Sequence, residues 1–134
     1  MVEIKSNCRY VCVELGKNVS LNAVIEGIDE KHVISWLHNG REITRGEEFI
    51  GEDGLSEHIF LRGGTNGVFT LEITNAQFLD KGTYSIKVYE QGHDNSLFEI
   101  TQKDVMLLEV DSYSDDMDMR LEGALVSDSE EYGV

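Results

Sequence analysis

The fold of this chain is decided by one stretch, Asp80-Lys81-Gly82-Thr83-Tyr84-Ser85-Ile86-Lys87-Val88. Its large apolar residues Tyr84, Ile86 and Val88 alternate with polar ones, so an extended segment here has one apolar face and one polar face. This period of two is typical of a β-strand that covers a core on one face only. We therefore predict a half-buried strand through these three residues.

The same alternation recurs in short segments over the first 110 residues. The segments that carry it, or that are further strand candidates, are Val11–Leu15, Val19–Ile25, Ile34–Trp36, Phe69–Ile73 and Val105–Val110. The turn clusters between them are Gly16–Asn18, Asn39–Gly40, Glu52–Gly54 and Gly63–Gly67. Several short strands with regular turn signals predict an all-β sandwich of two antiparallel sheets.

Composition limits the classes of function. The chain has 134 residues, 40% of them hydrophobic, which is enough for one domain with a core that needs no metal or disulfide. Its net charge of −15 argues against binding to nucleic acid or to an anionic membrane surface. No apolar run approaches the roughly 20 residues of a membrane span, so we expect a soluble, cytoplasmic domain.

The negative charge is concentrated at the C-terminus. Eight of the 26 acidic residues and only one arginine lie between Asp111 and Val134. Such a segment cannot bury enough apolar surface to order itself alone. We predict a domain over residues 1–110, followed by an acidic, mostly disordered tail over residues 111–134.

The two cysteines, Cys8 and Cys12, are four residues apart. In an extended segment their Cα atoms lie roughly 13 Å apart, whereas a disulfide needs less than about 7 Å. We therefore expect no disulfide within the domain, which is typical of proteins from a reducing compartment.

Several motifs together resemble an immunoglobulin domain. Leu71–Ala76 and Asp80–Tyr84 resemble strands E and F of that fold, and Trp36–Gly40 resembles the core tryptophan of strand C with its turn. The pattern is most similar to the intermediate (I-set) type found in titin, myomesin, twitchin and obscurin. The resemblance covers about residues 5–110 and implies a Greek-key sandwich.

The resemblance implies structural roles for the motif residues. Tyr84 would form a tyrosine corner next to Asp80, and Gly82 would adopt a backbone conformation that strains other residues. Trp36 and Leu71 would lie in the core. The inter-sheet disulfide of the family would join the positions that Ala23 and Ile86 occupy here, so an aliphatic contact is expected where the bridge would be.

Two apolar segments are candidates for partner binding. Gln91–Asp104 is longer than a compact hairpin requires, so we expect an enlarged loop or an extended hairpin. Its apolar residues Leu97, Phe98 and Ile100 would then lie on a sheet edge that recruits a partner by strand addition, or the loop would fold back on its own sheet. Phe78 and Leu79 form either a small exposed interface or, as we favour, a pair with one member tucked under the sandwich.

No motif indicates catalysis or a cofactor. None of the four histidines lies in a recognisable nucleophile motif, and there is no Cys/His metal spacing or glycine-rich phosphate loop. An EF-hand read from Asp111 lacks the glycine that its sixth position requires. We predict no enzymatic activity, no metal and no cofactor.

The tail carries two further candidates. Met117, Leu121 and Leu125 have helical spacing and would share one face if the tail ordered on a partner, although chance spacing is the simpler interpretation. Ser127 precedes Glu130 by three residues, a spacing that acidophilic kinases use, so it is a candidate phosphorylation site.

The sequence thus indicates a non-enzymatic interaction or structural module of an intracellular filament or scaffold protein. A homodimer is compatible with this interpretation. One alternative is an extracellular adhesion or receptor domain, in which the sequon at Asn18 would be glycosylated. Another is an elastic spacer without a partner of its own.

Overall fold

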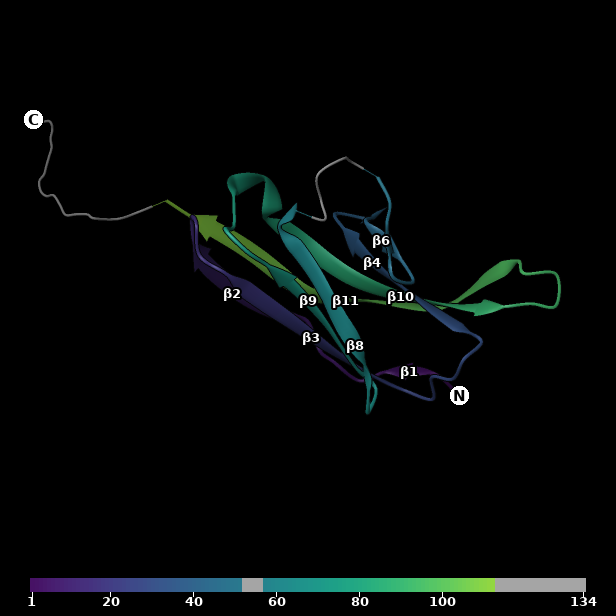
Figure 1. Cartoon of the computed structure of the whole chain (residues 1–134). Helices are drawn as coiled ribbons and strands as arrows, with labels where there is room; N and C mark the ends of the chain where they lie inside the picture. The colour runs from purple at the N-terminus through teal and green to yellow at the C-terminus, as the bar shows by residue number, and fades with distance from the viewer. Residues whose placement is uncertain (52–56, 113–134) are drawn as a thin grey trace, which may run out of the picture.

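Two β-sheets face each other in the computed structural model, which describes residues 1–51 and 57–112. The four-stranded sheet has the order β1 (Glu3–Ile4), β3 (Val19–Glu26), β9 (Val68–Ile73), β8 (Ile59–Thr65). The five-stranded sheet has the order β2 (Arg9–Glu14), β11 (Leu97–Asp111), β10 (Gly82–Gln91), β4 (His32–His38), β5 (Arg41–Glu42). A short ladder joins β6 (Thr44–Arg45) to β7 (Glu48–Phe49), and η2 (Phe78–Asp80) is a 3₁₀ turn (Figure 1).

The predicted all-β sandwich is confirmed. Burial alternates along β3, with Leu21, Ala23 and Ile25 inside and the residues between them exposed. All pairs between neighbouring strands are antiparallel except that of β2 with β11, which is parallel. The core lies between the sheets and includes Trp36 and Ile86, as the apolar alternation requires.

The Tyr84 segment has the geometry expected of a tyrosine corner. The Tyr84 hydroxyl donates a hydrogen bond to the main-chain oxygen of Asp80 at 2.5 Å. Gly82 has a φ of 132°, and a Cβ there would lie 2.2 Å from Oδ1 of Asn39. That oxygen accepts from the main-chain N–H of Thr83, so the glycine allows β10 to approach the turn after β4.

The segment after Tyr84 forms an extended hairpin, one of the two forms that its length predicts. β10 and β11 pair from Gly82 with Leu108 to Gln91 with Leu97. Two register shifts leave one extra residue each on β11, Ile100 and Val105. In Figure 1 the tip of this hairpin projects beyond the other strands.

β8 was missed from the sequence. We expected Gly63–Gly67 to be a turn, but Gly63–Thr65 belong to β8, and only Asn66 and Gly67 form the tight connection, both with positive φ. A Cβ on Gly63 would lie 2.8 Å from the Cα of Phe69. The glycine is therefore explained by the close approach of β9 and not by a turn.

Candidate functional site

Three of the four histidines make hydrogen bonds within the fold. His58 Nε2 lies 3.0 Å from Oδ1 of Asp80, and His38 donates to the main-chain oxygen of Lys81 at 2.7 Å. His32 accepts a main-chain hydrogen bond in its own turn. Within residues 1–51 and 57–112 no group of three or more His, Cys, Asp or Glu side chains is arranged to hold a metal ion. The absence of enzymatic activity stays a prediction.

A charged cluster occupies the five-stranded sheet on the face away from the core. Glu42 Oε1 lies 2.6 Å from Nη2 of Arg45, and Glu42 Oε2 lies 3.3 Å from Nζ of Lys87 and also accepts from the Tyr89 hydroxyl. Burial by itself would raise the pKa of Glu42, but these three donors outweigh it and hold that pKa below its ordinary value. Each charge in the cluster has a partner within the chain, and the cluster links β5, β6 and β10.

The hairpin exposes the apolar residues that the sequence predicts for partner binding. Phe98 is 58% exposed and Ile100 is 42% exposed, while Leu97 is half-buried. Among the described strands, β2 pairs with β11 only from Met106 onward, so the outer edge of the projecting part has no strand beside it. We call the exposed part of the hairpin that carries Leu97, Phe98 and Ile100 the hairpin surface.

The Phe78–Leu79 pair is exposed at the opposite end of the sandwich. Phe78 is 48% exposed and Leu79 is 90% exposed, so the favoured expectation that one of them is tucked under the sandwich is wrong. The reason is the 3₁₀ turn, in which the Asp80 side chain is buried instead and accepts from the main-chain N–H of Gln77. The 3₁₀ turn directs both apolar side chains outward.

The two cysteines are free, as their spacing predicts, and both are exposed. Cys12 donates a hydrogen bond to Oδ2 of Asp111 at 2.9 Å. This bond to the carboxylate raises the pKa of the Cys12 thiol. The tail candidates Met117, Leu121, Leu125 and Ser127 lie outside the described residues, so their roles stay predictions.

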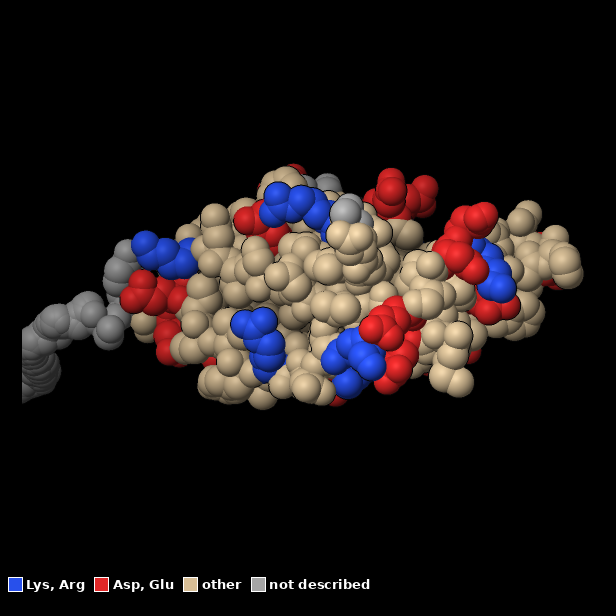
Figure 2. Space-filling view, turned by 90° about the horizontal axis from the view of Figure 1, so that it is seen from below, with Lys and Arg blue, Asp and Glu red and all other residues tan. Residues whose placement is uncertain are grey.

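On one face of the molecule, charged side chains surround an area of other residues. Figure 2 shows this face from below, with Lys, Arg, Asp and Glu gathered mostly toward its ends and edges. On the four-stranded sheet, the Thr70 hydroxyl donates to Oδ1 of Asn22 at 2.6 Å, and both side chains are neutral. We assign no site to these paired side chains.

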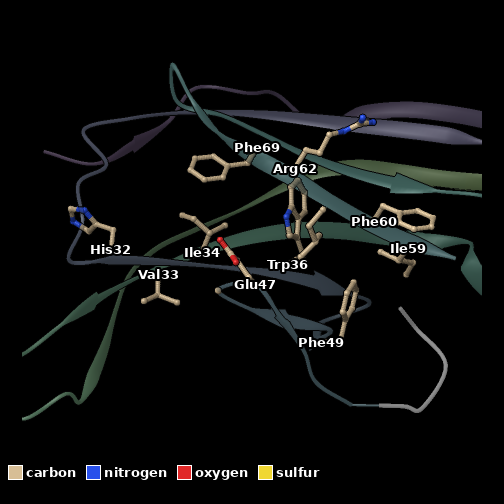
Figure 3. Close-up of a pocket in the computed structure, with 13 residues that line it drawn as sticks. His32, Val33, Ile34, Trp36, Glu47, Phe49, Ile59, Phe60, Arg62 and Phe69 are labelled. Carbon is tan, nitrogen blue, oxygen red and sulfur yellow. The ribbon is translucent and has the colours of Figure 1, made fainter. Parts of the chain in front are cut away.

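A cleft opens between the two sheets along the edge formed by β8. Its volume is about 540 Å³. One wall comes from β4 and the β6–β7 ladder, and the other from β8 and β9 (Figure 3). The apolar residues that line it are Val33, Ile34, Trp36, Phe49, Ile59, Phe60, Leu61 and Phe69. His32, Glu47 and Arg62 are the titratable residues in the lining, and the surface that the cleft exposes is about equally polar and apolar.

Trp36 contributes a buried polar group to the lining of this cleft. The side chain is only 3% exposed, yet within the described part of the chain its indole N–H has no hydrogen-bond acceptor, since the bond to Thr44 Oγ1 uses the main-chain N–H. In Figure 3 the indole stands between β4 and β8 with its nitrogen toward the lining residues. Sequence reasoning assigned Trp36 to the core and missed the cleft, because its walls are distant in sequence.

Comparisons with known proteins agree on one fold. The sequence model of the immunoglobulin I-set domain matches residues 2–101. A crystal structure of Dpr1 IG1 bound to DIP-eta IG1 superposes with a TM-score of 0.61 at 17% identity, covering 82% of this chain and 95% of that one. The RIG-5 IG1 homodimer has a TM-score of 0.60 at 20% identity, with 81% and 96% covered.

Murine CRIg is similar to the same extent, with a TM-score of 0.62 at 16% identity, and 82% of this chain and 98% of that chain are covered. At these identities the similarity shows the fold alone. No curated protein sequence matches the chain significantly. Within the described residues no helix is long and apolar enough to cross a membrane. The narrower resemblance to titin and myomesin domains stays a prediction.

Proposed function

This chain belongs to the immunoglobulin I-set family, and from that premise we propose that it is a non-enzymatic protein-binding module that contacts its partner through the hairpin surface. The observation that carries the proposal is the exposure of Phe98 and Ile100 on a hairpin that projects from the sandwich (Figure 1). Exposed aromatic side chains on a rigid support are the usual anchors of protein interfaces.

Side-chain contact explains this surface better than strand addition along β11. The extra residues Ile100 and Val105 interrupt the ladder with β10, and such bulges bend a strand edge and hinder pairing with a new strand. A partner would instead pack on Phe98 and on the bulged Ile100. In two similar structures an immunoglobulin domain binds DIP-eta IG1 or forms a homodimer, which supports a protein partner, including a second copy of this chain.

An intracellular filament or scaffold protein is the setting that we propose. Both cysteines are free thiols, and the buried Ala23 and Ile86 occupy the positions at which the family places its disulfide. A domain that is stable without this bridge suits a reducing compartment. The extracellular alternative keeps one supporting observation, since Asn18 of the sequon is exposed.

A spacer role is the second candidate function. In Figure 1 the N-terminus and the end of β11 lie at opposite ends of the sandwich, which is the arrangement that a tandem array of domains requires. The exposed Phe78 and Leu79 lie near the end of β11 and would contact a following domain. This role needs no partner on the hairpin surface.

Affinity capture separates the two roles. The immobilised chain is incubated with striated-muscle extract, and bound proteins are identified by mass spectrometry for the wild type, Phe98→Ser and the control Val24→Ser on the other sheet. We expect a protein that both the wild type and Val24→Ser retain and Phe98→Ser loses. If all three bind the same proteins, or none enriches anything, the hairpin surface is not a binding site and the spacer role gains support.

A further inference from the structure

We propose that the cleft beside β8 binds an extended segment of a partner protein, which adds to β8 as a further strand and inserts apolar side chains against Trp36. This site lies between the sheets, away from the hairpin surface, and no part of the proposed function depends on it. Three observations carry it: a free strand edge, an unpaired buried donor, and a cleft lined by large apolar side chains with an acidic side chain at its rim.

The edge of β8 has its backbone groups available. β8 is the last strand of its sheet, and no described strand lies on its outer side. The main-chain N–H of Thr74 donates to the His58 oxygen at 2.8 Å, which places the backbone groups of His58 toward β9. Because these groups alternate along an antiparallel strand, the N–H and C=O of Ile59, Leu61 and Gly63 point away from β9.

This edge is also regular where the groups are free. Ile59, Leu61 and Gly63 pair with β9 in unbroken register, and the one shift in this ladder comes after Gly63. The edge of β11, by contrast, has two bulges. Regular pairing without a bulge is the geometry in which a partner strand gains main-chain hydrogen bonds.

The indole of Trp36 indicates that the ligand also carries a hydrogen-bond acceptor. An indole N–H is a donor only, and a buried donor is ordinarily paired. In the described residues this one has no acceptor, so a ligand in the cleft that brings an oxygen would complete it. A main-chain carbonyl of an extended segment is such an acceptor, and the apolar lining contributed by Phe49 and Phe69 suits its side chains.

Charge selects among extended segments. Arg62 at the rim is already paired with Glu72 at 3.1 Å, whereas the exposed Glu47 has no ion-pair partner among the described residues. The chain carries a net charge of −15, which attracts basic partners and repels acidic ones. The ligand we infer has apolar residues at alternate positions with Lys or Arg beside them.

The single tryptophan of the chain makes the test direct, because its fluorescence reports on the cleft alone. The full chain is titrated with short peptides of alternating valine and threonine that are flanked by lysine or by glutamate. We expect saturable changes in fluorescence, with tighter binding of the lysine-flanked peptides. Glu47→Lys should weaken this preference, whereas Glu48→Lys, a matched charge change outside the cleft lining, should leave it unchanged.

Hydrogen exchange by NMR identifies the mode of binding. Saturation with the lysine-flanked peptide should slow exchange of the Ile59, Leu61 and Gly63 amides by roughly tenfold or more. The amides of Phe60 and Arg62, which face β9, should change little. A peptide with N-methyl groups on the pairing edge keeps the side chains but loses the main-chain donors, so it should not bind.

Three results would overturn the proposal. One is the absence of saturation with every peptide, and another is a fluorescence change without protection of the three outward amides. The third is a change in the tryptophan fluorescence of the free chain when Leu55 is replaced by serine. That change would mean that the occupant of the cleft is the chain's own segment 52–56 and not a partner. Phe98→Ser serves as a separate control: it should leave peptide binding unchanged, so failure of the hairpin surface and failure of the cleft are distinguishable.

Discussion

Replacing Tyr84 with phenylalanine removes one hydroxyl from a side chain that is otherwise fully buried. The hydroxyl donates to the main-chain oxygen of Asp80, and the ring stacks on His38 with centroids 4.5 Å apart. Phenylalanine keeps the stacking and the shape, so the change isolates the hydrogen bond. A net hydrogen bond contributes about 1 kcal/mol, and an oxygen left buried without a donor costs about 1–3 kcal/mol. We expect Tyr84→Phe to lower the free energy of unfolding by about 2 kcal/mol.

Urea denaturation measures this loss. With an m-value of about 2 kcal/mol/M, the midpoint should fall by about 1 M while m stays unchanged. Tyr10→Phe is the control, because Tyr10 is 68% exposed and donates no hydrogen bond within the described residues, so its change should stay within about 0.5 kcal/mol. Equal midpoints for Tyr84→Phe and the wild type would refute the role assigned to the corner.

Alkaline pH supplies a second check on the same variant. Burial, and then the nearby charge of Asp80, raise the pKa of Tyr84 above its ordinary value. A raised pKa means that the folded state holds the proton more tightly, so the associated stability is present below the ordinary tyrosine pKa of about 10 and is lost above it. The difference in the free energy of unfolding between the wild type and Tyr84→Phe should therefore become smaller above about pH 10. A difference that grows there would contradict this cause.

Three further changes test other parts of the fold. Glu42→Gln should lower the free energy of unfolding by about 1–2 kcal/mol at neutral pH. Because the pKa of Glu42 is lowered in the folded state, this difference should disappear as the pH falls below the ordinary glutamate pKa. Urea midpoints measured across a pH series check both expectations. The double variant Ala23→Cys, Ile86→Cys should form a disulfide in oxidising conditions and raise the free energy of unfolding by about 2–4 kcal/mol. Two free thiols in non-reducing mass spectrometry would contradict this. Gly82→Ala should cost about 2 kcal/mol or more in thermal unfolding, exceeding Gly40→Ala, whose added Cβ would have no atom within 4 Å although both glycines have positive φ.

The strands and the corner were predictable because their signals are local. Alternation along β3 and β10 assigns the core face residue by residue, and the Asp80–Tyr84 motif lies within a single turn and strand start. β8 was not predicted because its two glycines resemble a turn. Gly63 is instead required by the close approach of the neighbouring strand β9. A contact between segments leaves no signal in the window that contains only one of them.

The candidate sites divide in the same way. The length of Gln91–Asp104 marked Phe98 as a candidate contact, but the sequence left open whether this segment would expose the side chain or fold back on its own sheet. The cleft had no signal in the sequence, because Trp36, Phe49 and Phe69 come from three strands in different sheets. The binding properties of the cleft depend on β8 being the edge strand of its sheet. The order of strands in that sheet is set by pairing between segments that are far apart in the sequence.

The sequence by itself determined the fold class, the core faces of most strands and the absence of an internal disulfide. These properties follow from the kind of residue at each position, since burial of apolar side chains with period two admits few other arrangements. Only the tertiary structure decided that Phe78 and Leu79 both face outward, that bulges interrupt β11, and that β8 has a free edge beside an unpaired tryptophan donor. Each of these depends on distances between segments remote in sequence, and such distances are defined only once both sheets have packed.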